Sequence, residues 1–275
     1  MPEFDRIIRP RRGLIPIDLA EIWRFRELLA QLTWRDISVR YKQTLLGVIW
    51  FAAQPLSSMV VFTVIFGRLA KLPSNDAPYA VMTFAALLPW QFFSGSLVKI
   101  AQSLVAAAGI IQKVYVPRLI FPISASLGGL VDFVISLALL FGLMVYYGVA
   151  FRPHLILLPL FLVIGWCAAT AMGLWLSTMN VKYRDVGQAV PFMVQIAMYL
   201  SPVAYSSSLI PEQWRFLYNL NPLAGVIDGF RWCILGPQFE PYWPGFAASL
   251  VLVALMLIGG AYYFRYFEKT FADVI

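Results

Sequence analysis

Few ionisable residues lie inside the long apolar stretches of this chain, and those few are the first candidates for chemistry. Asp132 stands in an apolar run from 120 to 149. A carboxylate in such a run is a functional candidate, because a charged group is costly to bury away from water. Two roles are open for Asp132: a hydrogen-bonded structural role and a place on a transport pathway.

The stretch 201–237 predicts two short helices joined by a turn. Pro211 and Glu212 suit the first turn of one helix. That helix must end before Asn221-Pro222, because the residue before a proline disfavours helical angles. Asn221 then caps a second helix, which starts at Pro222 and ends at Gly236-Pro237.

The second of these helices, 222–235, carries charge but is too short to cross a membrane. Fourteen residues rise about 21 Å, against a hydrocarbon core of about 30 Å. Asp228 and Arg231, three residues apart, are expected to pair on one face. We predict a helical hairpin that enters one side of a bilayer and returns; the alternative is an amphipathic helix on the surface. The apolar stripe comprises Leu223, Ile227, Phe230 and Ile234.

Composition places the chain in a membrane. Its 275 residues are 60% hydrophobic and 13% charged, with a mean hydropathy of +0.74. A soluble domain is about half apolar and a quarter charged. The net charge of +7 does not indicate nucleic acid, because the basic residues flank apolar segments. Cys167 and Cys233 lack metal-ligand spacing and are expected to pack as small apolar residues.

The expected fold is an all-α integral membrane protein with six transmembrane helices. Residues 1–44 are predicted to form a cytoplasmic tail and an interfacial amphipathic helix, whose apolar side faces either the bilayer boundary or a soluble partner. Residues 45–275 form the transmembrane domain, with the hairpin between the last two spans. The apolar side comprises Ile22, Phe25, Leu28, Leu29 and Leu32. The spans are 45–66, 79–97, 120–149, 155–179, 186–204 and 246–264.

Orientation follows from the distribution of Lys and Arg. With the N-terminus inside, sixteen of the 21 basic residues fall in inner segments and five in outer ones. Basic residues accumulate on the cytoplasmic side. We therefore expect both termini in the cytoplasm and the hairpin on the outer face.

The sequence lacks the motifs of several enzyme and transporter classes. It contains no Gly-x-x-x-x-Gly-Lys-Ser/Thr loop for nucleotide phosphates, no metal-ligand cluster and no evident catalytic triad. A proton-coupled carrier usually has more than one intramembrane charge, with partners. The chain is therefore expected not to be an enzyme, and any energy source is expected to reside in another subunit.

Aromatic residues make up 16% of the chain and are the candidates for a ligand-lined channel. Aromatic ring faces can bind a sugar polymer, because the C–H surfaces of the sugar pack on the rings while its hydroxyl groups remain hydrated. Interfacial anchoring or lipid contact is the alternative. The candidate lining residues are Trp50, Trp90, Phe92, Phe93 and Tyr199.

Two short charged connectors are predicted on the cytoplasmic side. The first runs from Val98 to Arg118 and contains Lys113, Tyr115, Pro117 and Arg118. The second contains Lys182, Arg184 and Asp185. Connectors of this kind are suited to transmit force from a soluble motor protein to the membrane helices. They are equally compatible with simple turns whose basic residues follow the positive-inside rule.

Seven segments together resemble ABC-2-type permeases that export bacterial polysaccharides, in particular O-antigen exporters, with capsule and teichoic-acid permeases close to them. The likeness runs from about residue 15 to the end of the chain. The segments are Arg35–Trp50 with Gln54-Pro55, Leu88–Phe93, Lys113–Ile120, Asn180–Val186, Ser201–Tyr205, Asn219–Trp232 and Phe271–Ile275.

The resemblance implies a homodimer in the bacterial inner membrane, with two copies of a separate ATPase that bind ATP and Mg²⁺. The substrate would be an undecaprenyl-diphosphate-linked glycan used in lipopolysaccharide biosynthesis. The charged connectors would couple to the ATPase. Outer gate positions would be Asn221, Pro222, Asp228, Arg231 and Trp232.

Three other functions remain open at this point. They are a drug or lipid permease of the same family, a self-contained carrier or channel, and a membrane enzyme acting on a polyprenyl-linked glycan. The last is disfavoured because no carboxylate or metal-ligand cluster stands at the end of a span.

Overall fold

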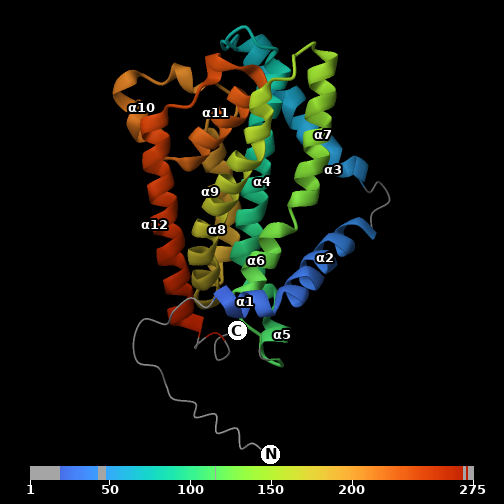
Figure 1. Ribbon diagram of the computed structural model, residues 1–275, viewed down its shortest axis with the longest axis vertical. Helices are drawn as coiled ribbons and strands as arrows, with labels where there is room; N and C mark the ends of the chain where they lie inside the picture. The colour runs from blue at the N-terminus through green and yellow to red at the C-terminus, as the bar shows by residue number, and fades with distance from the viewer. Residues whose placement is uncertain (1–18, 43–47, 115, 269–270, 272–275) are drawn as a thin grey trace, which may run out of the picture.

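A computed structural model describes residues 19–42, 48–114, 116–268 and 271 of the chain. All regular elements of these residues are helices, and the long ones run side by side along the long axis (Figure 1). α1 (Leu19–Arg24) and α5 (Ala108–Ile111) lie at the lower end of this bundle. α10 (Glu212–Tyr218) and α11 (Pro222–Leu235) lie at the upper end.

Five helices of the described residues are long and apolar enough to cross a membrane. α9 (Asp185–Tyr199) has fifteen residues, about 22 Å, and is too short to be counted with them. The prediction of six spans therefore stays a prediction. The five are α3 (Val48–Phe62) with the π-helix η1 (Thr63–Leu69), α4 (Tyr79–Ala106), α6 (Ile120–Leu127) with α7 (Leu130–Tyr146), η2 (Pro153–Leu157) with α8 (Leu158–Lys182), and α12 (Trp243–Phe267).

α4 is the central helix of the bundle. It packs against α3, α6, α7, α8, α9 and α11, and it approaches α8 so closely that a Cβ on Gly173 would lie 2.5 Å from Ile100. The predicted connector beginning at Val98 is wrong over its first nine residues, because α4 continues to Ala106. Lys99 therefore belongs to a helix rather than to a loop. A long lysine side chain can lie along an apolar helix and still place its ammonium group in polar surroundings, so the helix continues through this position.

The predicted third span is divided into two helices. α6 ends at Leu127 and α7 begins at Leu130, with Gly128-Gly129 between them. Two adjacent glycines weaken a helix, because they lack side chains and lose the most backbone entropy on folding. The break places Asp132 in the first turn of α7, where the free backbone N–H groups favour a carboxylate.

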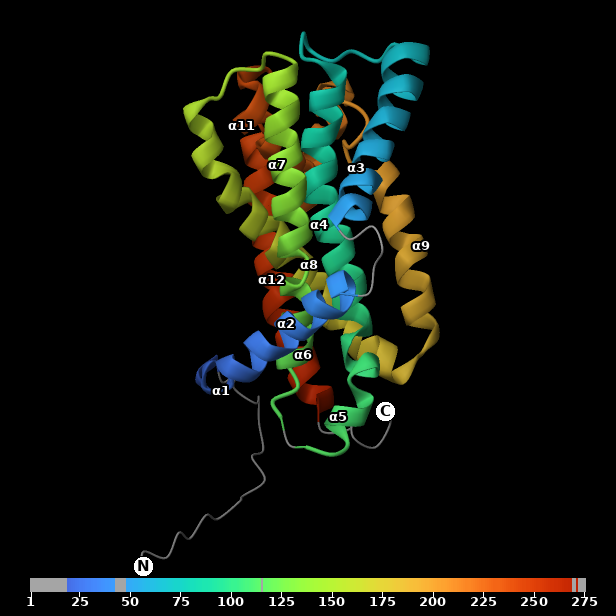
Figure 2. The same cartoon turned by 90° about the vertical axis from the view of Figure 1, so that its right-hand side faces the viewer.

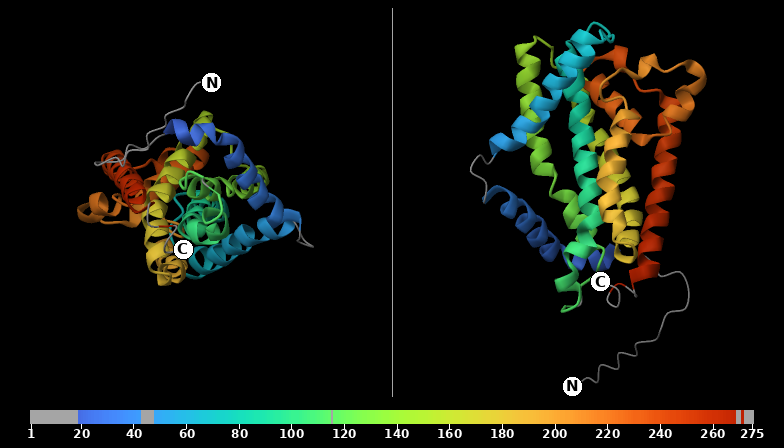
Figure 3. Two further views of the ribbon diagram at one scale, coloured as in Figure 1. Left: turned by 90° about the horizontal axis from the view of Figure 1, so that it is seen from below. Right: turned by 180° about the vertical axis from the view of Figure 1, so that it is seen from behind.

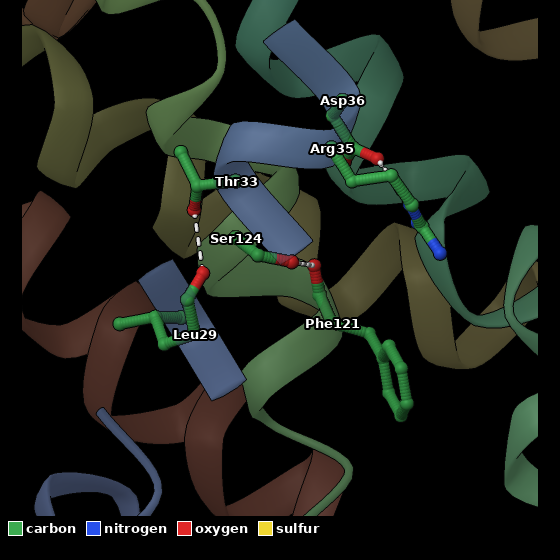
Figure 4. Close-up of polar contacts among 6 residues, drawn as sticks. All are labelled: Leu29, Thr33, Arg35, Asp36, Phe121 and Ser124. Atoms are coloured by element: carbon green, nitrogen blue, oxygen red, sulfur yellow. Dashed lines mark hydrogen bonds and ion pairs between the residues drawn. The ribbon is translucent and has the colours of Figure 1, made fainter. Parts of the chain in front are cut away.

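The N-terminal amphipathic segment forms α1 and α2 (Arg26–Lys42), which lie across the lower part of the bundle (Figure 2). The predicted apolar side packs against α6 and a cluster that includes Leu104 and Phe264 of the same chain. Of the five residues on this side Leu32 is buried and the other four are half-buried, so whether the bilayer or a soluble partner covers the remainder stays a prediction. Trp23 and Trp34 on the other side are 70% and 69% exposed. Figure 4 shows α2 crossing α6, each with side-chain hydrogen bonds inside its own helix, such as Thr33 to the Leu29 carbonyl at 2.9 Å.

α11 has the ends that the sequence predicted. The Leu223 amide donates to Asn221 Oδ1 at 3.0 Å, and Pro222 is the first helical residue. Gly236 ends the helix with φ +111°, a backbone conformation that favours glycine. A side chain there would also meet Arg152, whose Cζ would lie 2.7 Å from the added Cβ.

α11 is inserted between α4, α8 and α12 and does not lie on the surface. Twelve of its fourteen residues are buried, including Asp228 and Arg231. The alternative of an amphipathic surface helix is therefore wrong. Whether the hairpin enters a bilayer and returns stays a prediction.

The predicted pair of Asp228 and Arg231 is not among the ion pairs within 4.0 Å of the described residues. Arg231 Nε donates instead to the Met82 carbonyl of α4 at 3.1 Å. Its two terminal nitrogens donate to the carbonyls of Tyr205 at 2.8 Å and Val203 at 2.9 Å, in the loop after α9. Arg231 is fully buried, and its planar guanidinium joins three parts of the chain that are far apart in sequence.

Replacing Arg231 by Met should destabilise the upper end of the bundle, because the buried carbonyls of Met82 and Val203 would lose their donor at about 1–3 kcal/mol each, and the half-buried Tyr205 carbonyl would lose its donor as well. Arg231→Lys should recover only part of this stability, since one ammonium cannot reproduce the planar fork. The measurement is thermal unfolding of the detergent-solubilised chain. Arg68→Met, which removes an exposed arginine, is the control. Restored stability in Asp228→Arg with Arg231→Asp would instead support an ion pair.

Candidate functional site

A cavity of about 570 Å³ lies in the bundle and is lined by α4, α8, α9, α12 and the start of α11. We call it the aromatic cavity. Figure 3 shows α9 running along the face between α4 and α12. The lining residues from α4 are Trp90, Phe93 and Leu97, and those at the upper rim are Tyr199, Leu200, Ser201, Tyr205, Tyr218, Asn221 and Pro222.

Three of the five aromatic residues predicted to line a channel meet in this cavity: Trp90, Phe93 and Tyr199. Trp90 and Phe93 are three residues apart on α4, and their ring centroids are 5.8 Å apart. Phe92 faces the other side of α4 and packs edge-on against Phe133 of α7, so it does not line the aromatic cavity. Trp50 lies in α3, but its side chain is outside the described residues.

The upper rim of the aromatic cavity is a hydrogen-bonded segment, residues 201–205. The Tyr205 and Tyr218 hydroxyls are 3.0 Å apart, and Asn221 Nδ2 donates to Ser201 Oγ at 3.0 Å. The Tyr79 hydroxyl donates to the Ala204 carbonyl. Together with the Arg231 bonds, these contacts hold the segment against α4 and the hairpin. Asn221 and Pro222, predicted as gate residues, thus lie at the cavity rim.

Sequence reasoning missed Tyr205 and Tyr218 as members of this rim. The pKa of Tyr218 is raised, first by burial and then by its hydrogen bond with Tyr205, so the phenol remains neutral. No Asp, Glu, Lys or Arg is among the described residues that line the cavity. A neutral cavity with ring faces below and hydroxyl groups at the rim suits an uncharged ligand that has both C–H surfaces and hydroxyls.

The charged connectors lie at the opposite end of the bundle from α10 and α11 (Figures 1 and 2). Lys113, after α5, is exposed, as are Lys182 at the end of α8, Arg184 in the turn and Asp185 at the start of α9. Pro117 is buried and Tyr115 is outside the described residues. Arg118 is half-buried, its amide donates to Glu268 at 3.3 Å, and its guanidinium lies 5.8 Å from the Phe271 ring.

Asn180 fixes the second connector to α4. Its Nδ2 donates to the Ala101 carbonyl at 2.9 Å, and its Oδ1 accepts from the Gly187 amide at 2.9 Å. Asn180 is 4% exposed, and a Cβ on Gly187 would lie 2.8 Å from its Oδ1. The turn between α8 and α9 is therefore held against α4, so that a displacement of the turn would be transmitted to α4.

Asp132 accepts hydrogen bonds from two residues of α2, which supports its structural role. Arg40 forms an ion pair with Oδ2, and the Tyr41 hydroxyl donates to Oδ1 at 2.7 Å. The pKa of Tyr41 is raised, first by burial and then by this hydrogen bond, so Tyr41 stays a donor. These contacts tie α2 to the break between α6 and α7.

Comparison with known proteins decides the family. Residues 27–235 match the family model described as ABC-2 type transporter. The chain belongs to the ABC-2 type transporter family. The matched region includes the hairpin as far as Leu235, both charged connectors and every lining residue of the aromatic cavity except those from α12.

Relatives of this ABC-2 family member include named export permeases. It is 30% identical over 209 residues to the O-antigen export system permease protein RfbA of Klebsiella pneumoniae, covering 74% of this chain and 79% of the relative. It is 27% identical over 238 residues to RfbA of Myxococcus xanthus, covering 85% and 91%. It is 26% identical over 215 residues to the inner membrane transport permease YadH of Escherichia coli K12, covering 74% and 83%.

The topology of this ABC-2 permease can be tested with cysteines at exposed positions of the two ends, in a background with Cys167→Ala and Cys233→Ala. The positive-inside rule predicts that Gln213→Cys in α10 reacts with an impermeant maleimide added to intact cells. Lys182→Cys should react only after permeabilisation.

Lys71→Cys, in the loop before α4, is the control and should react as Gln213→Cys does. Labelling of Lys182→Cys from outside would overturn the orientation. Positions 225–230 are unsuitable for this experiment, because they are buried.

Proposed function

We propose that this ABC-2 permease is the membrane subunit of an ATP-driven exporter that moves an O-antigen-like polysaccharide, linked to undecaprenyl diphosphate, from the cytoplasm to the periplasm. The aromatic cavity is the observation that carries the proposal. Its rings and rim hydroxyls match the amphipathic surface of a sugar chain, and it contains no charged lining residue among those described. The names of the RfbA relatives support the substrate class.

ATP and Mg²⁺ would be bound by two copies of a partner ATPase, which dock at the end that carries Lys113 and the turn between α8 and α9. The exposed charges of both connectors support this assignment. The hydrogen bonds of Asn180 provide a path from the turn to α4, which lines the aromatic cavity. Movement of the turn would therefore change the shape of the cavity.

A second copy of the chain would complete the pathway as a homodimer. α9 supports this, because Val190 is its only buried residue, while Phe192, Met193 and Ile196 are 64%, 56% and 45% exposed. A second copy against α9 would cover this apolar face and enclose the aromatic cavity between subunits.

Replacing Trp90 and Phe93 together by Leu should reduce surface glycan by about tenfold, since each lost ring contact is worth about 0.5–1.5 kcal/mol. The measurement is surface glycan in a deletion strain complemented with each variant. Phe92→Leu is the matched control, because Phe92 is equally buried on α4 but faces away from the aromatic cavity.

Equal export by the double variant and by the control would contradict glycan binding by Trp90 and Phe93 and would indicate that these rings only pack within the bundle. Unchanged surface glycan in the deletion strain itself would favour a drug or lipid substrate. Transport by the purified chain in liposomes without ATP would favour a self-contained carrier.

Lys113→Glu should uncouple ATP hydrolysis from export while leaving the fold intact, because Lys113 is exposed and its replacement reverses a charge on the docking surface. The measurement compares ATPase activity and glycan export of the reconstituted complex. Lys71→Glu, at the other end of the bundle, is the control. Normal coupling in Lys113→Glu would remove α5 and its following loop from the ATPase interface. Arg118 is less suitable, since its contacts with Glu268 and Phe271 mix folding with coupling.

A further inference from the structure

A second cavity lies on the opposite face of α4 from the aromatic cavity. It has a volume of about 290 Å³ and is formed where α2 ends close to α3, α4 and α7 (Figure 2). We call it the polar cavity. Its polar lining residues are Arg40, Gln54, Gln91, Ser94, Ser96, Lys99, Asp132 and Ser136.

The polar cavity carries a net positive charge. Two cations, Arg40 and Lys99, and one carboxylate, Asp132, line it. Both oxygens of Asp132 already accept hydrogen bonds from α2, one of them in the ion pair with Arg40. Because Asp132 pairs with Arg40, Lys99 is the cation whose charge an additional anion in the cavity would balance.

Several polar groups of the cavity are without a described hydrogen bond. Ser94 and Ser96 donate to backbone carbonyls, but no hydrogen bond is described for the side chains of Lys99, Gln91 and Ser136. Polar groups between membrane helices are costly unless water or a ligand satisfies them. Because one water needs about 10–15 Å³ of such space, the cavity has room for a polar group of several heavy atoms.

The depth of the polar cavity points to the kind of anion. Lys99 lies seven residues before the lower end of α4, about 10 Å along a helix that is about 42 Å long. With α4 centred on a hydrocarbon core of about 30 Å, the core boundary lies about 6 Å from the end of the helix. Lys99 then lies about 4 Å inside this boundary, and its long side chain reaches the headgroup region of one leaflet. α2, with exposed Trp23 and Trp34, lies on the same lower part of the bundle, and Trp favours that boundary.

We propose that the polar cavity binds the phosphate group of a membrane lipid, with Lys99 as the direct anion contact. Gln91 and Ser136 provide further donors. The bonds from Arg40 and Tyr41 keep Asp132 from repelling the phosphate. The apolar part of the lipid would leave the site along α3 and α7, whose outward positions Val60, Val61 and Val134 are 53%, 48% and 60% exposed. This inference concerns lipid binding and does not rest on the proposed transport activity.

Native mass spectrometry of the full chain in detergent provides the test, with three ligands titrated separately: phosphatidylglycerol, a polyprenyl diphosphate and inorganic phosphate. Zwitterionic phosphatidylcholine measures non-specific adhesion. The wild-type chain should bind one of the two anionic lipids above this background. Lys99→Gln should weaken that binding by about tenfold or more, because the variant removes the charge-assisted hydrogen bond to the phosphate.

Two further variants make the result specific. Lys99→Arg keeps the cation and should retain most of the affinity, and Lys71→Gln removes a lysine at the other end of the bundle and should bind as the wild type does. The two lipid titrations show whether a bulk phospholipid or a polyprenyl carrier is the ligand. Equal binding by wild type and Lys99→Gln, or binding of inorganic phosphate alone, would overturn the proposal.

Discussion

The buried guanidinium of Arg231 is the interaction on which the upper half of this protein depends. A loop that enters a low-dielectric bundle exposes carbonyls that helices would otherwise satisfy, and each unsatisfied carbonyl is costly. Arg231 donates to Val203, Tyr205 and Met82 at once and so allows the segment 201–205 to cross between α9 and the hairpin. That segment forms the rim of the aromatic cavity. The shape of the cavity therefore depends on Arg231, although Arg231 is not one of its lining residues.

α4 divides the bundle into two sites with opposite physical character. One face presents Trp90 and Phe93 to a neutral cavity, and the other presents Gln91 and Lys99 to a charged one. Neutral ring faces suit sugar surfaces, whereas a desolvated ammonium suits phosphate. A lipid-linked glycan contains both chemical groups. The arrangement is therefore compatible with separate recognition of its two parts and equally with a structural lipid beside the transport pathway.

The two ends of the bundle are connected by rigid elements. α4 and α8 pack closely along their length, and Asn180 fixes the lower turn to α4 just as Arg231 fixes the upper segment to it. A movement at the charged lower end would therefore reach the rim of the aromatic cavity through α4 itself. Arg118 is half-buried and contacts the C-terminal part of the chain through its amide at Glu268 and its guanidinium at the Phe271 ring, whereas Lys113 is exposed.

The sequence by itself determined the membrane class, the approximate places of the long apolar helices and both ends of α11. These features depend on local rules: apolar run length, the Asn221-Pro222 cap and the conformational freedom of Gly236. Only the tertiary structure decided that Phe92 faces away from Trp90 and Phe93, that Arg231 binds carbonyls instead of Asp228, and that Lys99 joins Asp132 beside one cavity. Helical periodicity states which residues share a face but not which neighbour covers it, and long-range packing supplies that choice.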